Sequence, residues 1–160
     1  MEYPQYAATW KSSLFGDEMM RLGVDICGLS EVRWNGQGHF TTLDGHTIGL
    51  VYSGRLTQVM SGVAVWIHRK IAGALVGYEP ISHRVLVVRL KAKPRNIALI
   101  QVYGPTTAAT DEEMERFYQD LSQAVKPVPK GTCCLQWATL TPKSAEENHL
   151  QCHPQLGCMA

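Results

Sequence analysis

Short apolar runs separated by turn residues fill the middle of this chain and constrain its fold more than any other feature. The runs at residues 62–67, 84–90 and 96–103 are nearly continuous in apolar side chains, which is typical of strands covered on both faces. Their spacing predicts an α/β sandwich. We expect its strands near residues 24–30, 47–52, 62–67, 84–90 and 96–103, with a further run at 74–78 that ends at the break Glu79-Pro80.

Two helices are expected on either side of this block of strands. Thr110 and Glu113 have the spacing of a capping box, which predicts a helix over residues 111–125. Its apolar residues recur at helical spacing and predict a core-facing stripe. They are Met114, Phe117, Leu121 and Val125. Residues 14–22 predict a second helix, with Gly23 as its C-cap.

Composition places the chain among ordinary globular proteins. Its 160 residues predict one domain, and 45% of them are hydrophobic. The formal charge of +1 gives no overall basic signature, so binding of nucleic acid would need a local patch. No apolar run is long enough to span a membrane, and the first residues do not resemble a signal peptide. The odd number of cysteines, five, predicts a reduced intracellular protein of the nucleus or cytoplasm.

The run at residues 24–30 ends in a lone carboxylate, Glu31. A carboxylate at a strand exit can bind a hard cation, or it can be a solvated charge at the end of a strand. Arg33 and Trp34 follow, and they could contact nucleic acid through a phosphate and by stacking on a base. A half-buried aromatic is the alternative for Trp34.

The two ends of the chain lack hydrophobic periodicity. Residues 1–13 therefore predict a mobile N-terminus. Residues 131–160 contain four of the five cysteines, and we expect them to form an unrelated, disordered tail. Cys133 and Cys134 are adjacent and the chain has no C-x-x-C, so we expect no zinc site there.

Three segments in order resemble one family. They are residues 29–34 (Leu-Ser-Glu-Val-Arg-Trp), 82–86 (Ser-His-Arg-Val-Leu) and 101–106 (Gln-Val-Tyr-Gly-Pro-Thr). Together they resemble the endonuclease/exonuclease/phosphatase superfamily, in particular the apurinic-type endonuclease domain of non-LTR retrotransposons and the craniofacial development protein 2-like sequences. The resemblance implies an incomplete α/β sandwich of this type, the N-terminal half of a domain, over residues 14–130.

The resemblance also implies roles for residues of a Mg²⁺-dependent DNA endonuclease. Glu31 matches the metal-binding glutamate, and Tyr103 matches a catalytic tyrosine that contacts the scissile phosphate. Both should then lie on one edge of the sandwich, within about 10 Å of each other. Arg84 is expected among the substrate-binding residues, as electrostatic support, or else is part of a structural ion pair. Thr106 stands where some relatives carry a substrate-binding asparagine. A core tyrosine with a solvated hydroxyl is the alternative for Tyr103.

Other motifs of the family do not occur in this sequence. Residues 7–11 hold no metal-site asparagine, and residues 128–135 hold no Gly-Asp-x-Asn. The final Ser-Asp-His cannot follow, because no aspartate occurs after Asp120. Two hypotheses from different classes remain. The chain is a metal-dependent phosphodiesterase that acts on DNA, or it is a catalytically inactive interaction module or remnant with weak or absent Mg²⁺ binding.

Overall fold

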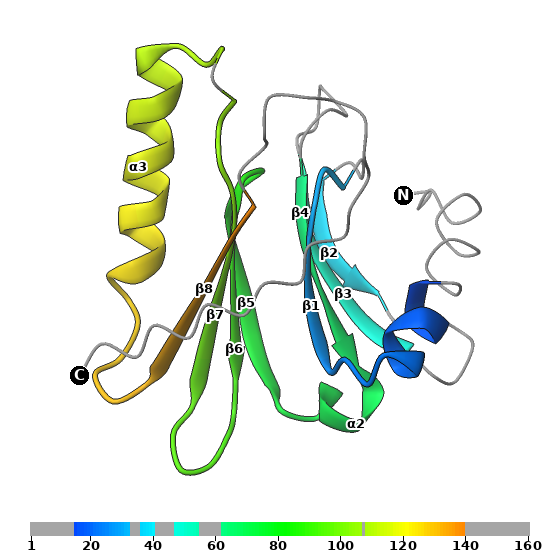
Figure 1. The fold of residues 1–160 in the computed structure, drawn as a ribbon. Coiled ribbons are helices and arrows are strands. Elements are labelled where there is room, and N and C mark those ends of the chain that lie inside the picture. The colour runs from blue at the N-terminus through cyan, green and yellow to red at the C-terminus, as the bar shows by residue number, and fades with distance from the viewer. Residues whose placement is uncertain (1–14, 33–35, 41–46, 55–61, 107, 140–160) are drawn as a thin grey trace.

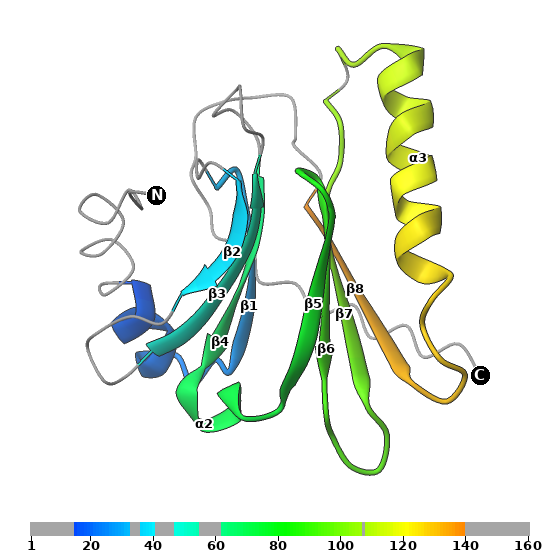
Figure 2. The ribbon, with the colours of Figure 1, turned by 180° about the vertical axis from the view of Figure 1, so that it is seen from behind.

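Two four-stranded sheets lie face to face, and a helix lies on the outer side of each sheet (Figures 1 and 2). The computed structural model describes residues 15–32, 36–40, 47–54, 62–106 and 108–139. The elements after a first helix over residues 15–21 are β1 (Ile26–Ser30), β2 (Gln37–Phe40), β3 (Thr47–Gly54), β4 (Gly62–His68), α2 (Arg69–Ala72), β5 (Leu75–Ser82), β6 (Val85–Leu90), β7 (Ile97–Tyr103), α3 (Asp111–Val125) and β8 (Cys133–Thr139). The expected α/β sandwich is confirmed. Within these residues no helix is long and apolar enough to cross a membrane.

The two sheets differ in how their strands are connected. The first has the order β1-β4-β3-β2, and each pair of neighbours is antiparallel. The second has the order β5-β6-β7-β8, and its last pair, β7 and β8, is parallel. Parallel neighbours need a crossover connection, and α3 provides it between β7 and β8.

The main core lies between the two sheets. Successive side chains of a strand point to opposite faces, so every second residue of β4, β6 and β7 contributes to this core. Its buried members are Val63, Val65, Ile67, Leu86, Val88, Leu90, Leu99 and Tyr103. The intervening residues form two outer cores: Phe15 and Met19 pack with Trp66 of β4, while Phe117 and Leu121 of α3 pack over β6 and β7. Burial on both faces explains why these strands read as continuous apolar runs.

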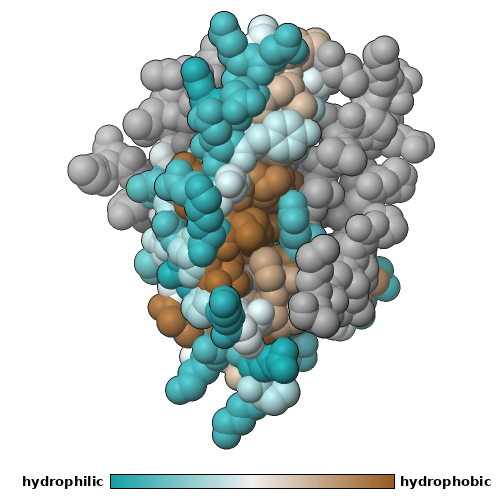
Figure 3. Space-filling view, turned by 90° about the vertical axis from the view of Figure 1, so that its left-hand side faces the viewer, coloured by the Kyte–Doolittle hydropathy of each residue, from teal (hydrophilic) through white to brown (hydrophobic). Residues whose placement is uncertain are grey.

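The long helix α3 begins at the expected capping box. Thr110 Oγ1 accepts from the backbone N–H of Glu113 at 3.3 Å, and Glu113 Oε2 accepts from the N–H of Thr110 at 3.2 Å. Ala124 completes the buried side of the helix instead of Val125, which is 47% exposed, so that part of the expected stripe is wrong. Figure 3 looks onto the side of the molecule where α3 lies. Hydrophilic side chains project toward the viewer there, and a hydrophobic strip lies beside them.

Two boundaries differ from the sequence-based expectation. β5 continues through Pro80 instead of ending at residue 78. It is an edge strand of its sheet, where a proline without an N–H is tolerated. The predicted tail contains β8, which pairs with the whole length of β7, so the expected disorder is wrong for Cys133–Thr139. Residues 1–14 and 140–160 lie outside the described residues.

Candidate functional site

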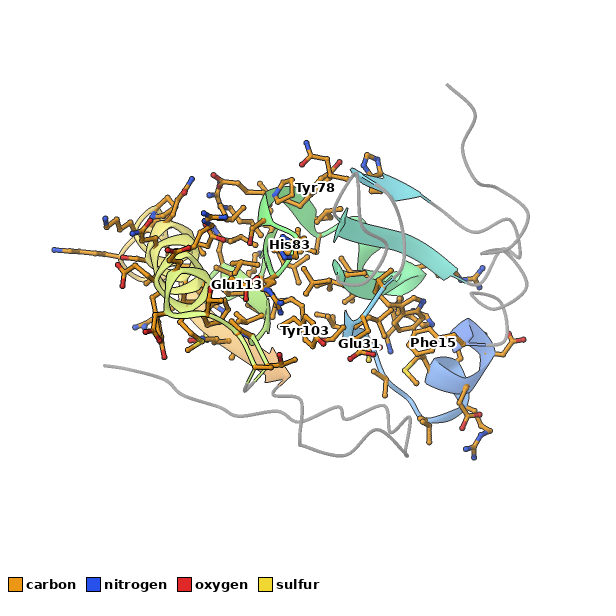
Figure 4. The ribbon with its side chains drawn as sticks, turned by 90° about the horizontal axis from the view of Figure 1, so that it is seen from above. Phe15, Glu31, Tyr78, His83, Tyr103 and Glu113 are labelled. Atoms are coloured by element: carbon orange, nitrogen blue, oxygen red, sulfur yellow. The ribbon has the colours of Figure 1, made fainter. Side chains whose placement is uncertain are left out.

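One edge of the sandwich gathers the ends of strands from both sheets. β1 ends at Ser30 in the first sheet, and β7 ends at Tyr103 in the second. The turn at residues 83–84 leads into β6, whose first residue Val85 lies opposite Val102 of β7. Figure 4 looks onto this edge from above and shows Glu31 and Tyr103 next to each other, with His83 nearby. Residues from three separate segments of the sequence therefore meet here.

Glu31 leaves β1 in a strained backbone conformation. Its φ is +59°, the left-handed region that residues with a Cβ rarely adopt, and the side chain is exposed. The next residue anchors the chain again, because Val32 N–H donates to the carbonyl oxygen of Gly62 at 3.0 Å. Such strain persists only where the surroundings hold it, and it often marks functional sites.

Tyr103 connects this carboxylate to the core. Its ring is only 6% exposed and lies in the cluster between the sheets. Its hydroxyl donates to Glu31 Oε1 at 2.9 Å. The expectation that Glu31 and Tyr103 share one edge within about 10 Å is thereby confirmed. The hydroxyl is directed to a carboxylate of the protein, a contact the sequence alone did not indicate.

Arg84 supports Tyr103 from the turn between β5 and β6 in the same sheet. Its Nη1 donates to the carbonyl oxygens of Tyr103 and Gly104, at 3.4 and 3.2 Å. Its guanidinium carbon lies 5.1 Å from the centre of the Tyr103 ring, within the range of a cation–π contact. The alternative expectation for Arg84 was a structural ion pair. None of the three ion pairs found among the described residues includes it.

A second polar contact joins the sheets beside the first. Gln101 is 1% exposed, and its Nε2 donates to Ser30 Oγ at 3.3 Å. Sequence reasoning assigned no role to either residue. The available signal was a glutamine at an inward position of an otherwise apolar strand, between Leu99 and Tyr103.

The remaining expected site residues are less closely connected to this edge. Thr106 is exposed and lies in the connection between β7 and α3, where its carbonyl oxygen accepts from Ala109 N–H. Arg33 and Trp34 lie outside the described residues. Their expected contacts with nucleic acid stay predictions.

The groups at this edge fit a divalent cation only in part. Glu31 offers an exposed carboxylate, the kind of oxygen ligand that Mg²⁺ prefers. The described residues contain no group of three or more His, Cys, Asp or Glu side chains that could hold a metal ion. Among the described residues Glu31 would be a single carboxylate ligand, and Mg²⁺ commonly keeps several waters as its other ligands.

Known proteins resemble this chain over only part of their length. No protein-family model matches it. Craniofacial development protein 2 of Bos taurus is 36% identical over 120 residues, which are 75% of this chain and 20% of that protein. The protein of the same name from Tragulus javanicus is 34% identical over the same shares. The chain thus spans about a fifth of the length of these relatives.

A solved structure has a similar fold over the superposed residues. The crystal structure of AP endonuclease LMAP from Leishmania major superposes with a TM-score of 0.53 at 15% sequence identity. The superposition covers 78% of this chain and 49% of that one. Identity at this level is evidence for the fold alone.

Proposed function

We propose that the edge carrying Glu31 and Tyr103 derives from the Mg²⁺-dependent site of a retrotransposon-type DNA endonuclease. Two findings support this: the chain has an endonuclease/exonuclease/phosphatase-like fold, and it is a relative of craniofacial development protein 2. We propose further that these 160 residues alone do not cleave DNA. The observation that supports the site is the 2.9 Å hydrogen bond between Tyr103 and Glu31 at the exits of two strands in different sheets.

Glu31 is the residue that would bind the metal. Bound there, Mg²⁺ would neutralise negative charge on a phosphodiester oxygen. The ion dehydrates reluctantly, and a single carboxylate offsets little of that cost. Binding should therefore be no tighter than about the millimolar range.

Tyr103 is the residue that would bind the phosphate. A tyrosine hydroxyl has one proton to donate, and here Glu31 accepts it. A phosphate oxygen only accepts hydrogen bonds, so it would compete with Glu31 for that proton. Cation binding to the Glu31 carboxylate would weaken its hold on the proton and favour the phosphate contact. Metal and phosphate should therefore bind with positive coupling.

Arg84 and Thr106 have secondary roles in this proposal. Arg84 holds the chain at Tyr103 and Gly104 and adds positive charge beneath the tyrosine ring. Its guanidinium donates to carbonyl oxygens, so we assign it support of Tyr103 and no direct contact with substrate. The exposed hydroxyl of Thr106 could donate to a phosphate at the end of β7.

The proposed lack of cleavage follows from the missing base. Hydrolysis needs a group positioned to take a proton from water, which contributes about 10²–10⁴-fold to the rate. The final Asp-His pair of the family has no counterpart, since no aspartate occurs after Asp120. Groups of one catalytic unit are strongly non-additive, so retention of Glu31 and Tyr103 does not preserve a proportionate share of activity.

The second candidate is an interaction module that does no chemistry. The four edge strands favour it, since β1, β2, β5 and β8 each have one neighbour among the described strands. Unpaired strand edges are templates for pairing with another chain. In this case nucleic acid and Mg²⁺ are not ligands at all.

A plasmid-nicking assay tests the proposal. The purified chain is incubated with supercoiled DNA with and without Mg²⁺, beside Glu31→Ala and Tyr103→Phe. We expect no nicking above the buffer control in any sample. Robust Mg²⁺-dependent nicking that is lost in Glu31→Ala would contradict the proposed inactivity and show that other residues of the chain complete the site.

A further inference from the structure

Gln101 is a polar side chain enclosed in an apolar core. It points inward from β7, like its neighbours Leu99 and Tyr103 two residues away on either side. Among the described residues it is the single buried residue that is polar or charged. Its Nε2 donates to Ser30 Oγ, while its Oε1 has no hydrogen-bond partner in the described part of the chain. A buried amide with an unsatisfied oxygen lowers the stability of the fold. Stabilisation of the core therefore does not explain why a glutamine stands at this position.

The partner of Gln101 directly precedes the site carboxylate. Ser30 is the last residue of β1, and Glu31 follows it. The two cross-sheet hydrogen bonds therefore form a pair: Gln101 with Ser30 at 3.3 Å, and Tyr103 with Glu31 at 2.9 Å. They join the last residue of β1 and the residue after it to two residues on the same face of β7.

The exit of β1 needs such an anchor. In its own sheet β1 is hydrogen-bonded to β4, and it lies at the edge of the strand order. Directly after it, Glu31 holds a φ of +59°, which costs energy for a residue with a Cβ. The hydrogen bond of Val32 N–H to Gly62 fixes the far side of this strained residue. The hydrogen bond from Gln101 fixes Ser30, the residue before Glu31.

We propose that Gln101 is a positioning residue for the Glu31–Tyr103 pair and acts through Ser30. Its amide holds the end of β1 against β7, so that the strained Glu31 presents its carboxylate to Tyr103. This inference rests on the proposed function for the importance of the pair, but the geometry it describes exists without metal or DNA. Loss of the amide should loosen the pair without unfolding the protein.

The test replaces the amide by an apolar side chain of similar shape. Gln101→Met removes both the donor and the unsatisfied oxygen, while Leu99→Met is the matched control at the adjacent inward position of β7. The readout is the ¹³Cζ NMR signal of Tyr103, which senses the hydrogen bond of the hydroxyl. Glu31→Ala gives the position of that signal without the bond, and thermal unfolding gives the stability of each variant.

We expect Gln101→Met to unfold at or above the wild-type midpoint and to move the Tyr103 signal at least halfway to its position in Glu31→Ala. Leu99→Met should leave the signal in place. Ser30→Ala should move it as Gln101→Met does, and the double variant should move it no further, because the two residues act in series. If Gln101→Met does not fold, Ser30→Ala carries the test alone. An unchanged Tyr103 signal in Ser30→Ala, or in a folded Gln101→Met, would overturn the inference.

A Mg²⁺ titration of the same variants separates this inference from the proposed function. If the wild type binds Mg²⁺ at Glu31, Gln101→Met should bind it about tenfold more weakly, as is common when a group that orients a ligand is lost. If no variant binds Mg²⁺ but the Tyr103 signal still moves in Gln101→Met, the metal role fails while the positioning role stands.

Discussion

The hydroxyl of Tyr103 donates its hydrogen bond to Glu31 Oε1 at 2.9 Å, across the interface between the two sheets. The tyrosine ring is buried in the core, while the carboxylate is exposed at the edge. This pair links the packing of the sandwich to the group that could bind a cation. A phosphate bound at this edge would need the same hydroxyl proton of Tyr103 for its own hydrogen bond.

Removal of the Tyr103 hydroxyl should cost little stability. Tyr103→Phe keeps the buried ring and leaves Glu31 solvated, so the expected loss is about 1 kcal/mol, the usual net value of one hydrogen bond. Urea unfolding measures it. Tyr78→Phe is the matched control, because the Tyr78 hydroxyl lies 2.9 Å from His39 Nδ1 on the exposed surface. A loss above about 3 kcal/mol in Tyr103→Phe would mean that the hydroxyl supports more than this one contact.

The positive φ at Glu31 predicts that glycine is more stable than alanine at this position. At an ordinary helix position the order of the two residues is reversed. Because φ is +59°, Glu31→Gly should be more stable than Glu31→Ala by about 0.5–1 kcal/mol, although glycine costs more entropy on folding. The control is Glu112, an exposed residue of α3, where the glycine variant should be less stable than the alanine variant by about 1 kcal/mol. Equal stability of the two Glu31 variants in urea unfolding would argue against the strained conformation.

Strand positions were predictable because the central strands are buried on both faces. The runs that became β4, β6 and β7 are nearly continuous in apolar residues, and their observed bounds lie within a residue or two of those expected. α3 was predictable from its capping box. β8 was missed, since it pairs in parallel with β7 after a helical crossover and its sequence, Cys-Cys-Leu-Gln-Trp-Ala-Thr, lacks a clear pattern.

The site was predictable only where the family resemblance supplied residue types. Glu31 and Tyr103 were placed together on that ground, but their hydrogen bond joins residues 72 positions apart and has no local signal. The contact between Ser30 and Gln101, 71 positions apart, is of the same kind. The positive φ of Glu31 was also invisible in sequence, because positive φ is expected mainly of glycine and this residue is a glutamate.

Loss of the Arg84 side chain should matter more than loss of an exposed ion pair. Arg84→Ala removes hydrogen bonds to two carbonyl oxygens and a contact with the Tyr103 ring, and we expect it to cost about 1–2 kcal/mol. Arg89→Ala breaks a partly exposed salt bridge to Glu79 and should cost about 0–1 kcal/mol. Chemical denaturation of both variants compares them. An equal or smaller loss for Arg84→Ala would contradict its supporting role.

Cys134 should make stability fall at high pH. Burial raises the pKa of its thiol, and the neighbouring Cys133 raises this pKa further. The folded protein therefore holds the proton more tightly than the unfolded chain does. This contribution is fully present below the ordinary thiol pKa and is lost as pH rises through the raised one. Urea unfolding between pH 7 and 10 should show a smaller fall in stability for Cys134→Ala than for the wild type, and an identical fall would refute the linkage.

We propose above that Glu31, hydrogen-bonded to Tyr103, binds a cation weakly at the edge of the sandwich. A Mg²⁺ titration followed by NMR at the Glu31 amide and the Tyr103 ring tests it directly. We predict that both signals shift together with a dissociation constant on the order of millimolar, and that the Tyr103 shift disappears in Glu31→Ala. No shift up to about a hundred millimolar Mg²⁺, well above that range, or an unchanged Tyr103 response in Glu31→Ala, would contradict the account.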